Sequence, residues 1–335
     1  PTATVSRHTP TAVLAFDSLR TANRLGLAQW LFDVENPLTS RVIVNRFWQL
    51  FFGRGLVATP EDFGNQGALP SHPALLDWLA SDFRDQGWDM KALIKKMVLS
   101  EAYRRDARWS EQSRARDADN VWLSRGPSQR LTAEMLRDQA LVASGLYYEK
   151  LGGKWVKPYQ PPGIWKEMAN QIGENKYRPS QGRDLYRRSL YGYWKRTIPP
   201  PNMLTFDASE RAECTVKRQQ TSTPLQSLVL FNDPIYTEAA RVLATRYQVR
   251  GLKPAEQIGS AFRQITSRAI TGKELALLDE LFKTELARFA KAPQEANALL
   301  AVGASPVNTS LPAEQLAGMT VVINTIFNLD EAKFK

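Results

Sequence analysis

The first residues that could do acid–base chemistry are His72 and the carboxylates on either side of it. Asp62 precedes this histidine in a glycine-rich segment, and Asp77 follows it five residues later. A histidine close to a carboxylate can serve as a general base, so Asp62 and His72 are candidate catalytic residues. The alternative is that His72 caps or braces its loop. No serine or cysteine lies in a G-x-S-x-G-like context, which gives a hydrolase triad little support.

A second acidic pair, Glu134 and Asp138, lies four residues apart in a segment with helical periodicity. This spacing places both carboxylates on one face of a helix, with Arg137 beside them. Two such carboxylates can bind a hard cation or do acid–base work, so both are candidate catalytic residues. The alternative is an ordinary face that is solvated or neutralised by the arginine. We predict no metal site in the chain.

The segment 45–88 concentrates aromatic residues and glycines. Arg46 and Arg54 could pair with Asp62 in a buried lattice that holds the loop, because a buried arginine is costly unless it is paired. The alternative is an anion site in which the two guanidinium groups bind a carboxylate or a sulfate. Arg46, Arg54 and the nearby Trp48 are therefore candidate ligand-binding residues.

The segment 151–196 mixes aromatic and cationic residues without a sustained period. Its aromatic and cationic residues include Trp155, Tyr159, Trp165, Tyr177, Tyr191, Tyr193, Trp194, Lys157, Arg178, Arg187, Arg188, Lys195 and Arg196. Aromatic rings can stack on the apolar faces of sugars, and neighbouring cations can pair with uronate or sulfate groups. This pattern favours a site for an acidic polysaccharide, and its candidate ligand-binding residues are Trp165, Tyr177, Arg187, Arg188 and Trp194. The alternative is that the aromatics fix a long loop onto the helices and that the arginines form salt bridges.

The elements that must position these residues are helices. Apolar residues recur at helical spacing through most of the chain, which predicts a mainly α, multi-helix fold with long ordered loops rich in aromatic residues, glycine and proline, and little or no sheet. Helix-start signals occur at Ser71, Asp89, Thr223–Gln226 and Thr271–Glu274. The longest expected helices span 128–148 and 223–247. We predict one compact unit made of a linker or arm (1–16), an N-terminal helical part (17–150) with a loop at 53–72, an irregular aromatic and basic insertion (151–222) and a C-terminal helical part (223–335).

Composition limits the classes of function. The formal net charge is +10 and the pI is near 9.7, but lysine and arginine are spread widely and no nucleic-acid-binding signature occurs. Such a charge is typical of solubility or of a polyanionic surface partner, and nucleic-acid binding is the third and weakest hypothesis. Cys214 is the only cysteine, which excludes an internal disulfide and a CxxCH haem attachment, and we expect a buried, inert thiol. No apolar run approaches the roughly 18 residues that cross a bilayer.

Two long blocks make the chain resemble a known family. They are NRFWQLFFGRGLVATPEDFGNQGALPSHPALLDWLA, from Asn45, and YRRSLYGYWKRTIPPPNMLTFDASERAECTVKRQQTSTPLQSLVLFNDPIYTEAARVLA, Tyr186–Ala244. Together they resemble the planctomycete secreted domain one family, a domain of unknown function. The resemblance implies an exported protein in which this domain usually lies at the C-terminus, after a planctomycete-type cytochrome c module. A chain that opens on Pro1 fits a mature or excised fragment.

The leading hypothesis is therefore an uncharacterised accessory domain of an exported, cytochrome-c-linked protein. It would bind a neighbouring domain of the parent protein or an acidic polysaccharide through the 45–72 stretch and the 155–196 region. No cofactor is expected in this chain, and the haem would belong to a separate module. The competing hypothesis is a polysaccharide-active enzyme whose acid–base groups are Asp62, His72, Glu134 or Asp138. In that case two carboxylates should face one open cleft, roughly 5–10 Å apart.

Overall fold

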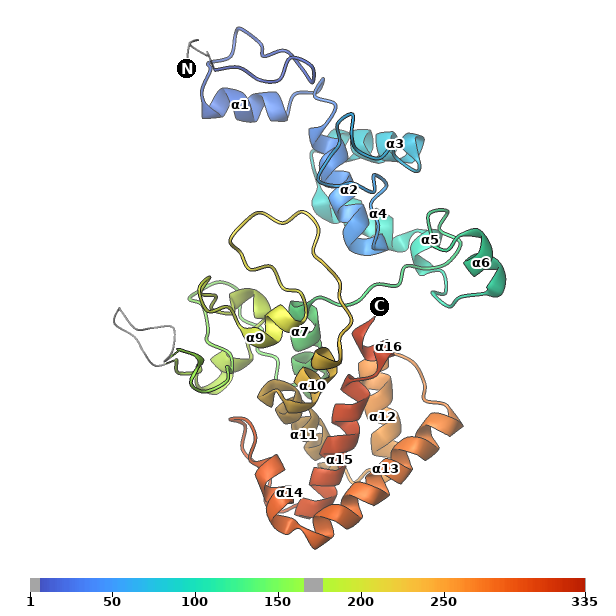
Figure 1. Cartoon of the computed structure of the whole chain (residues 1–335), viewed down its shortest axis with the longest axis vertical. Helices are drawn as coiled ribbons and strands as arrows, with labels where there is room; N and C mark the ends of the chain where they lie inside the picture. Colours follow the sequence, from blue (N-terminus) through green and yellow to red (C-terminus); the bar gives the residue numbers. More distant parts are fainter. Residues whose placement is uncertain (1–6, 166–176, 335) are drawn as a thin grey trace. The chain divides into compact units, whose positions relative to one another are not determined.

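The computed structural model describes residues 7–165 and 177–334, and it confirms the mainly α fold (Figure 1). Within these ranges no β-strand forms, and extended segments pair only through isolated bridges such as Val156 with Gly192. The chain divides into two compact units, unit 1 at residues 1–129 and unit 2 at residues 130–335. Residues 1–6 of the predicted arm and 166–176 of the predicted insertion lie outside the described part.

Unit 1 is built from six helices within its described residues. They are α1 (Arg24–Leu31), α2 (Thr39–Phe52), α3 (Pro73–Asp85), α4 (Met90–Leu99), α5 (Glu101–Arg104) and α6 (Glu111–Arg116). Its core forms where one face of α2 packs against α3 and α4. The buried residues of this cluster are Val44, Trp48, Phe52, Leu56, Val57, Leu76, Leu79, Phe83, Leu93 and Met97. Each fully buried side chain of this size contributes about 1.5–3 kcal/mol.

Helix ends in unit 1 follow local chemistry. Gly53 ends α2 with a φ of 83°, a backbone conformation that favours glycine. Asp89 caps α4 as predicted, because its carboxylate accepts hydrogen bonds from Lys91 N and Ala92 N. Ser71 does not cap α3, since its hydroxyl donates to Leu56 O at 3.2 Å and His72 occupies the N-cap position instead.

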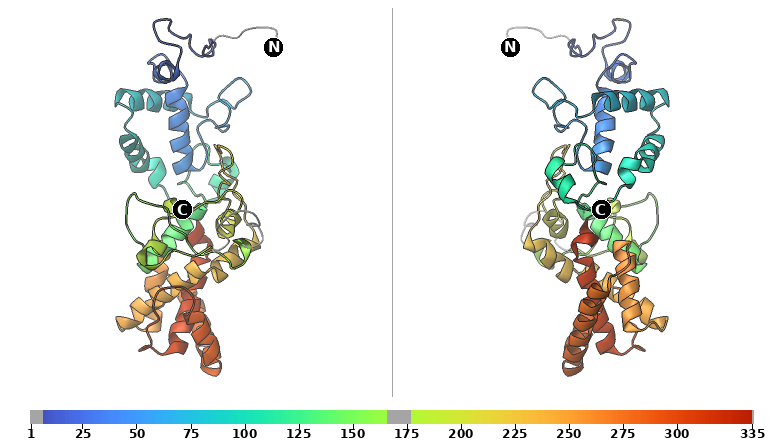
Figure 2. Two further views of the ribbon diagram at one scale, coloured as in Figure 1. Left: turned by 90° about the vertical axis from the view of Figure 1, so that its left-hand side faces the viewer. Right: turned by 90° about the vertical axis from the view of Figure 1, so that its right-hand side faces the viewer.

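Unit 2 contains the remaining helices that are given for the described residues. They are α7 (Ala133–Ser144), α9 (Pro201–Thr205), α10 (Pro224–Asn232), α11 (Pro234–Val249), α12 (Pro254–Thr266), α13 (Gly272–Lys291), α14 (Pro293–Leu300), α15 (Ala313–Phe327) and α16 (Asp330–Lys333), with short 3-10 helices at Gly182–Tyr186 and Ser189–Tyr191. The apolar helices α11 and α15 lie side by side in its core (Figures 1 and 2). Helices α12, α13 and α14 pack against α15, and α7 packs against α11.

Two predicted helices are shorter than expected. The 223–247 helix is broken at Asp233, which has an extended backbone and caps α11 by accepting from Ile235 N. Pro234 follows as the first residue of α11, where its missing N–H costs nothing. The 128–148 helix is limited to α7, because Leu131 N donates to Lys333 O in an extended pairing and Gly145 ends the helix with a φ of 79°.

The compact units of the structure do not follow the segments that differ in amino-acid composition. Residues 151–165 and 177–222 stand out in sequence, yet they belong to the same compact unit as α7 and the C-terminal helices. Residues 7–16 form no helix, but Leu14 O accepts a hydrogen bond from the buried Trp30 indole at 2.9 Å. None of the helices in the described ranges combines the length and hydropathy that a membrane span requires.

Candidate ligand-binding site

Two buried arginines anchor the segment that contains the predicted aromatic site. Arg137 of α7 donates to Leu185 O and Arg187 O, both at 2.9 Å, and to Ser189 Oγ at 3.2 Å. Burial lowers the pKa of Arg137, and the nearby Asp138 opposes that shift. An arginine predicted only as a neighbour of a carboxylate pair thus joins α7 to the 185–189 backbone.

Arg187 continues this anchor from the other side. Its guanidinium group donates to Lys150 O and Lys154 O at 2.8 Å and to Gly152 O at 2.5 Å, and it lies 4.0 Å from the centre of the Tyr191 ring. The residue is 2% exposed. Arg187 was predicted to bind a ligand, but its donors are used by the backbone and it lies out of reach of a surface ligand.

Backbone pairing brings the aromatic residues together. Val156 N donates to Tyr191 O at 2.9 Å, and Tyr193 N donates to Val156 O at 2.7 Å, which places Trp155 beside Tyr193. Lys157 exchanges hydrogen bonds with Ser180, so that Tyr177 joins the same group. We call the result the aromatic–cation cluster, which consists of Trp155, Lys157, Trp165, Tyr177, Tyr193 and Lys195.

The rings of the aromatic–cation cluster form a continuous group. The ring centres of Trp155 and Tyr193 are 4.6 Å apart, those of Trp165 and Tyr177 are 5.2 Å apart, and those of Trp165 and Tyr193 are 6.1 Å apart. The Trp165 indole donates to Gln160 Oε1 at 2.6 Å. The Tyr177 hydroxyl donates to Pro158 O at 2.7 Å, and burial raises the pKa of Tyr177.

Two lysines lie over these rings. Lys157 Nζ is 5.4 Å from the Trp155 ring centre and 5.6 Å from those of Tyr177 and Tyr193. Lys195 Nζ is 4.7 Å from the Trp165 ring centre. Such cation–π contacts hold the ammonium groups at fixed positions beside the aromatic surface. Trp155 is 56% exposed, whereas Trp165 is 8% exposed, so Trp155 presents the open ring.

A small pocket adjoins the cluster at Tyr193. Tyr159, Gln160, Trp194 and Arg211 are among the residues that line it. The Trp194 indole donates to Glu210 O at 3.1 Å, and the Arg211 guanidinium lies 4.6 Å from the Trp194 ring centre.

A buried carboxylate fixes one wall of this pocket. The Tyr159 hydroxyl donates to Glu238 Oε2 at 2.9 Å, and Tyr186 donates to Glu238 Oε1 at 2.8 Å. Ser305 N donates to the same Oε1 at 2.6 Å. Burial raises the pKa of Tyr159, and the neighbouring Glu238 adds to the shift. Nothing in the sequence marked Glu238 as a residue of this site, apart from its position among the apolar residues of a helix.

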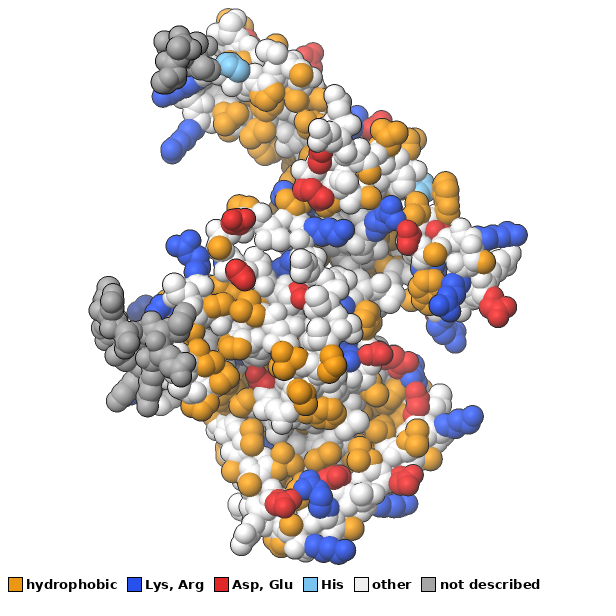
Figure 3. Space-filling view, viewed as in Figure 1, with side chains coloured by type: hydrophobic (Ala, Val, Ile, Leu, Met, Phe, Trp, Pro, Cys, Tyr) orange, Lys and Arg blue, Asp and Glu red, His pale blue; other side chains and the backbone are white. Residues whose placement is uncertain are grey.

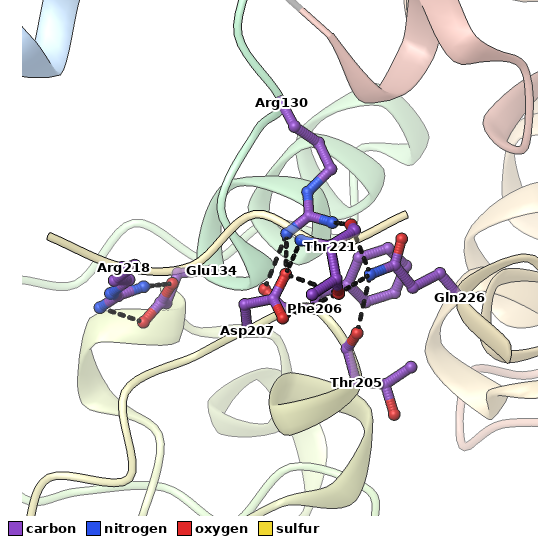
Figure 4. Close-up of polar contacts among 8 residues, drawn as sticks. All are labelled: Arg130, Glu134, Thr205, Phe206, Asp207, Arg218, Thr221 and Gln226. Atoms are coloured by element: carbon purple, nitrogen blue, oxygen red, sulfur yellow. Dashed lines mark hydrogen bonds and ion pairs between the residues drawn. The ribbon is translucent and has the colours of Figure 1, made fainter. Parts of the chain in front are cut away.

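The loop that carries Arg211 is tied at its ends (Figure 4). Asp207 accepts from Thr221 N and Thr221 Oγ1, both at 2.9 Å, and it forms an ion pair with the buried Arg130. Arg130 also donates to Thr221 O. Gln226 donates to Thr205 O and Thr221 O at 3.0 Å, which replaces the capping box predicted at Thr223–Gln226. Residues 208–220 thus form a loop with joined ends, and from Glu210 onward its residues are exposed except for the half-buried Val216.

The carboxylates predicted for acid–base work have separate partners. Glu134 forms a two-point pair with Arg218, at 2.8 and 3.1 Å (Figure 4). Burial raises the pKa of Glu134, but the hydrogen bonds from Arg218 outweigh it and the net pKa is lowered. Asp138 accepts from Ser189 N at 2.8 Å and Ser189 Oγ at 2.7 Å, and the exposed Arg188 lies 3.7 Å away.

The residues predicted in unit 1 do not form the expected lattice. Arg46 and Arg54 are exposed, and Arg54 pairs with Asp119 at 3.3 Å rather than with Asp62. Asp62 Oδ1 accepts from Gly64 N at 2.7 Å. The predicted lattice is therefore wrong, because these charges stay in solvent, where no partner is needed to offset burial.

Two other predicted residues of unit 1 have structural surroundings. Trp48 is buried in the core and stacks on Phe52 with a ring-centre distance of 4.0 Å. His72 Nδ1 lies 3.0 Å from Ser71 Oγ, and the His72 ring meets Trp122 edge-on at 5.8 Å.

The loop after α2 is held by a residue that sequence reasoning missed. The buried Asn45 accepts from Val57 N at 2.9 Å and donates to Val57 O at 3.1 Å. A Cβ atom at Gly55 would lie 2.5 Å from Val57 O and 2.7 Å from the Asn45 amide nitrogen, so only glycine fits there. The signal that could have found this brace is an asparagine on the apolar face of a predicted helix.

Metal binding and thiol chemistry have few candidate residues in the ranges 7–165 and 177–334. No three His, Cys, Asp or Glu side chains gather there as a metal site would require. Cys214 is free and exposed on the 208–220 loop, contrary to the expected buried thiol, because that loop lies outside the core.

Fold and site together define a mainly α, two-unit protein that displays an ordered group of aromatic and cationic residues. The chain belongs to PSD1, a family of proteins of unknown function (DUF1553), whose model matches residues 23–282. This match confirms the family expected from the two sequence blocks. Neither the curated proteins nor the solved structures contain a match to the chain.

Proposed function

We propose that unit 2 binds an acidic polysaccharide through the aromatic–cation cluster. The observation that carries this proposal is the open Trp155 ring, which lies 4.6 Å from Tyr193 and 5.4 Å from the Lys157 ammonium group. An aromatic face and a fixed cation at this separation suit a sugar ring whose carboxylate or sulfate lies at its edge.

Different residues of the cluster would contact different parts of the polysaccharide. The apolar face of one sugar would lie on the exposed Trp155, while its acidic group would contact the ammonium group of Lys157. Lys195, which lies over Trp165, would serve an acidic group on a neighbouring sugar. Because both lysines are held by ring contacts, less side-chain entropy is lost on binding than for free lysines.

The enzymatic alternative gains no support from the acidic residues. A general acid needs a raised pKa, whereas the pKa of Glu134 is lowered through its pair with Arg218. Asp138 is engaged by the Ser189 backbone and hydroxyl, and Asp62 by a backbone amide of its own loop. Carboxylates that are held in this way favour a binding or structural role.

We further propose that the chain acts outside the cytoplasm, as part of a parent protein that carries a cytochrome c module. The support for this proposal is the family resemblance alone. The haem would then lie in that separate module, and neighbouring domains of the parent protein would be partners of the 45–72 stretch.

Binding of purified chain to immobilised polysaccharides tests the proposed ligand. The panel should include a uronate-rich, a sulfated and a neutral polysaccharide, with wild type compared with Trp155→Ala and Lys157→Gln. We expect binding to the acidic members only, weakened by salt, with at least about a tenfold loss in Trp155→Ala.

Trp78→Ala is the matched control, because Trp78 is 54% exposed and lies on α3, outside unit 2. It should bind like wild type, and all variants should keep the wild-type melting temperature. Equal binding of neutral and acidic polysaccharides, or no binding to any of them, would contradict the proposal.

A further inference from the structure

Unit 1 carries a second exposed group of aromatic and cationic residues, remote in sequence from the aromatic–cation cluster. It comprises Arg104, Trp109, Arg114, Arg116 and Trp122, and we call it the arginine–tryptophan surface. Trp109 is 55% exposed and Trp122 is 68% exposed. In the same unit Trp30 and Trp48 are 6% and 7% exposed, whereas Trp78 on α3 is 54% exposed.

A hydrogen-bonded loop holds Trp122 in place. The buried Asp117 carboxylate accepts from Trp122 N at 3.1 Å and from Ser124 N at 3.3 Å. Arg125 Nη1 donates to Asp117 O at 2.8 Å, and Arg125 N donates to Asn120 Oδ1 at 3.2 Å. The exposed ring therefore lies on an ordered loop, which reduces the entropy lost when a partner binds.

The same loop is tied to the segment that carries Trp109. Arg105 Nη1 donates to Leu123 O at 2.5 Å, and Gly126 N donates to Asp106 O at 2.9 Å. A Cβ atom at Gly126 would lie 2.1 Å from Arg105 O, so this close approach needs glycine. Arg125 lies 3.7 Å from the Trp109 ring centre and supports one face of that ring.

Three exposed arginines lie close to the two rings in sequence. Arg104, Arg114 and Arg116 are exposed and form no ion pair with any described residue. Figure 3 shows basic side chains beside hydrophobic ones over the region of α5 and α6. Four acids lie in the same stretch of sequence: Asp106 is paired with Arg108, Asp117 is buried, Asp119 is paired with Arg54, and Glu111 is exposed. The surface therefore complements an acidic partner.

We propose that the arginine–tryptophan surface docks an acidic protein segment with apolar anchor side chains. Tryptophan and arginine are the residues most enriched at the energetic centres of protein interfaces. Among the described residues, Trp109 and Trp122 make no ring contact with each other, since one is supported by Arg125 and the other by His72. Two separate anchors suit two side chains of a peptide better than a continuous run of stacked bases or sugars. Each guanidinium group can bind an Asp or Glu carboxylate through two hydrogen bonds.

Fluorescence anisotropy of the full chain with labelled peptides tests this docking. The probe is a short Glu-rich peptide with two phenylalanines, and its controls are the same peptide with alanine for phenylalanine and with lysine for glutamate. We expect saturable binding of the first peptide only. Trp122→Ala and Arg114→Glu/Arg116→Glu should each weaken it at least about tenfold.

Matched variants separate this surface from general charge effects. Lys91→Glu/Lys95→Glu makes the same change in net charge on exposed positions of α4, and Trp78→Ala removes another exposed tryptophan of unit 1. Both should bind like wild type. Trp155→Ala should also bind like wild type, which separates this inference from the proposed polysaccharide site.

Three outcomes would overturn the proposal. The first is no binding of the acidic aromatic peptide. The second is equal binding of the peptide without phenylalanine. The third is equal binding of a heparin oligosaccharide or single-stranded DNA that Trp122→Ala leaves unchanged, because a polyanion site needs no apolar anchor.

Discussion

At the scale of single residues, burial decides which of the predicted binding residues can meet a ligand. Arg187 and Arg188 are neighbours that sequence treats alike. The structure buries Arg187 against three carbonyl oxygens and leaves Arg188 at the surface, 3.7 Å from Asp138. No sequence pattern distinguishes Arg187 from Arg188, because the segment lacks the helical or strand periodicity that would assign a side chain to a buried or an exposed face.

These two arginines provide a matched test of burial. Arg187→Met leaves the carbonyls of Lys150, Gly152 and Lys154 without their donor, so we expect a loss of at least about 3 kcal/mol in the free energy of unfolding. Arg188→Met should stay within about 1 kcal/mol of wild type, as is usual for an exposed ion pair. Urea unfolding followed by circular dichroism measures both. A reversed order would contradict the anchoring role.

Asn45 gives a second test at this scale. Asn45→Ala removes both hydrogen bonds to Val57 and leaves a buried N–H and C=O unpaired, which should cost about 2–4 kcal/mol. The adjacent Arg46→Ala, at an exposed position, should cost less than about 0.5 kcal/mol. The same urea titration applies. A large loss of stability in Arg46→Ala would instead support the predicted ion-pair lattice of Arg46, Arg54 and Asp62.

Glu274 makes stability depend on pH. Hydrogen bonds from Arg268 and from Thr271 N lower the pKa of Glu274 from 4.5 to about 2. Because the folded pKa is depressed, this carboxylate stabilises the fold fully above pH 4.5, and the contribution is lost as the pH falls through about 2. Unfolding of Glu274→Gln should therefore differ from wild type most at neutral pH, and the difference should shrink over this window. A difference between the two proteins that stays constant from neutral pH to pH 2 would contradict this role of Glu274.

At the scale of elements, local signals predicted some helix boundaries well. The Asp89 cap and the Thr271–Glu274 capping box are both confirmed, because each depends on a few adjacent residues. The capping box at Thr223–Gln226 fails because Gln226 donates to carbonyls of other segments instead. Only the tertiary structure supplies those partners.

The sequence predicted which segment holds the candidate site, but not which of its side chains are exposed. The segment 151–196 was identified by its mixture of aromatics and cations, and Trp165 and Tyr177 do lie in the cluster. The open ring is Trp155, whereas Trp165 is largely buried. Which ring stays exposed depends on the pairing of Val156 with Gly192 and of Lys157 with Ser180, and such long-range pairings leave no local pattern.

The loop 208–220 is an element whose order depends on one carboxylate. Asp207→Ala removes its bonds to Arg130 and Thr221, so the joined ends should separate and trypsin should cleave at Arg211, Lys217 or Arg218 about tenfold faster. Glu134→Gln, which weakens only the partly exposed pair with Arg218, should have a smaller effect. Equal cleavage of Asp207→Ala and wild type would mean that the loop is held elsewhere.

At the scale of the whole molecule, lysine and arginine are spread widely, and two surfaces combine a part of this charge with aromatic rings. Each of the two compact units displays tryptophan rings beside fixed or exposed cations. In unit 2 the rings form one continuous group with lysines, which favours sugars. In unit 1 the rings stand apart among arginines, which favours a peptide. A family of unknown function thereby gains two distinct binding hypotheses, each with its own variants.

The most direct test of the central claim compares two ligands that share their sugar rings and differ in charge. Isothermal titration of the full chain uses an oligogalacturonate and its methyl-esterified form, in which the carboxylates are neutral esters. We predict saturable binding of the charged form, weak or no binding of the ester, and at least about a tenfold loss in Trp155→Ala but not in Trp122→Ala. Equal affinity for both forms, or full binding by a stably folded Trp155→Ala, would contradict the claim that the aromatic–cation cluster recognises an acidic polysaccharide.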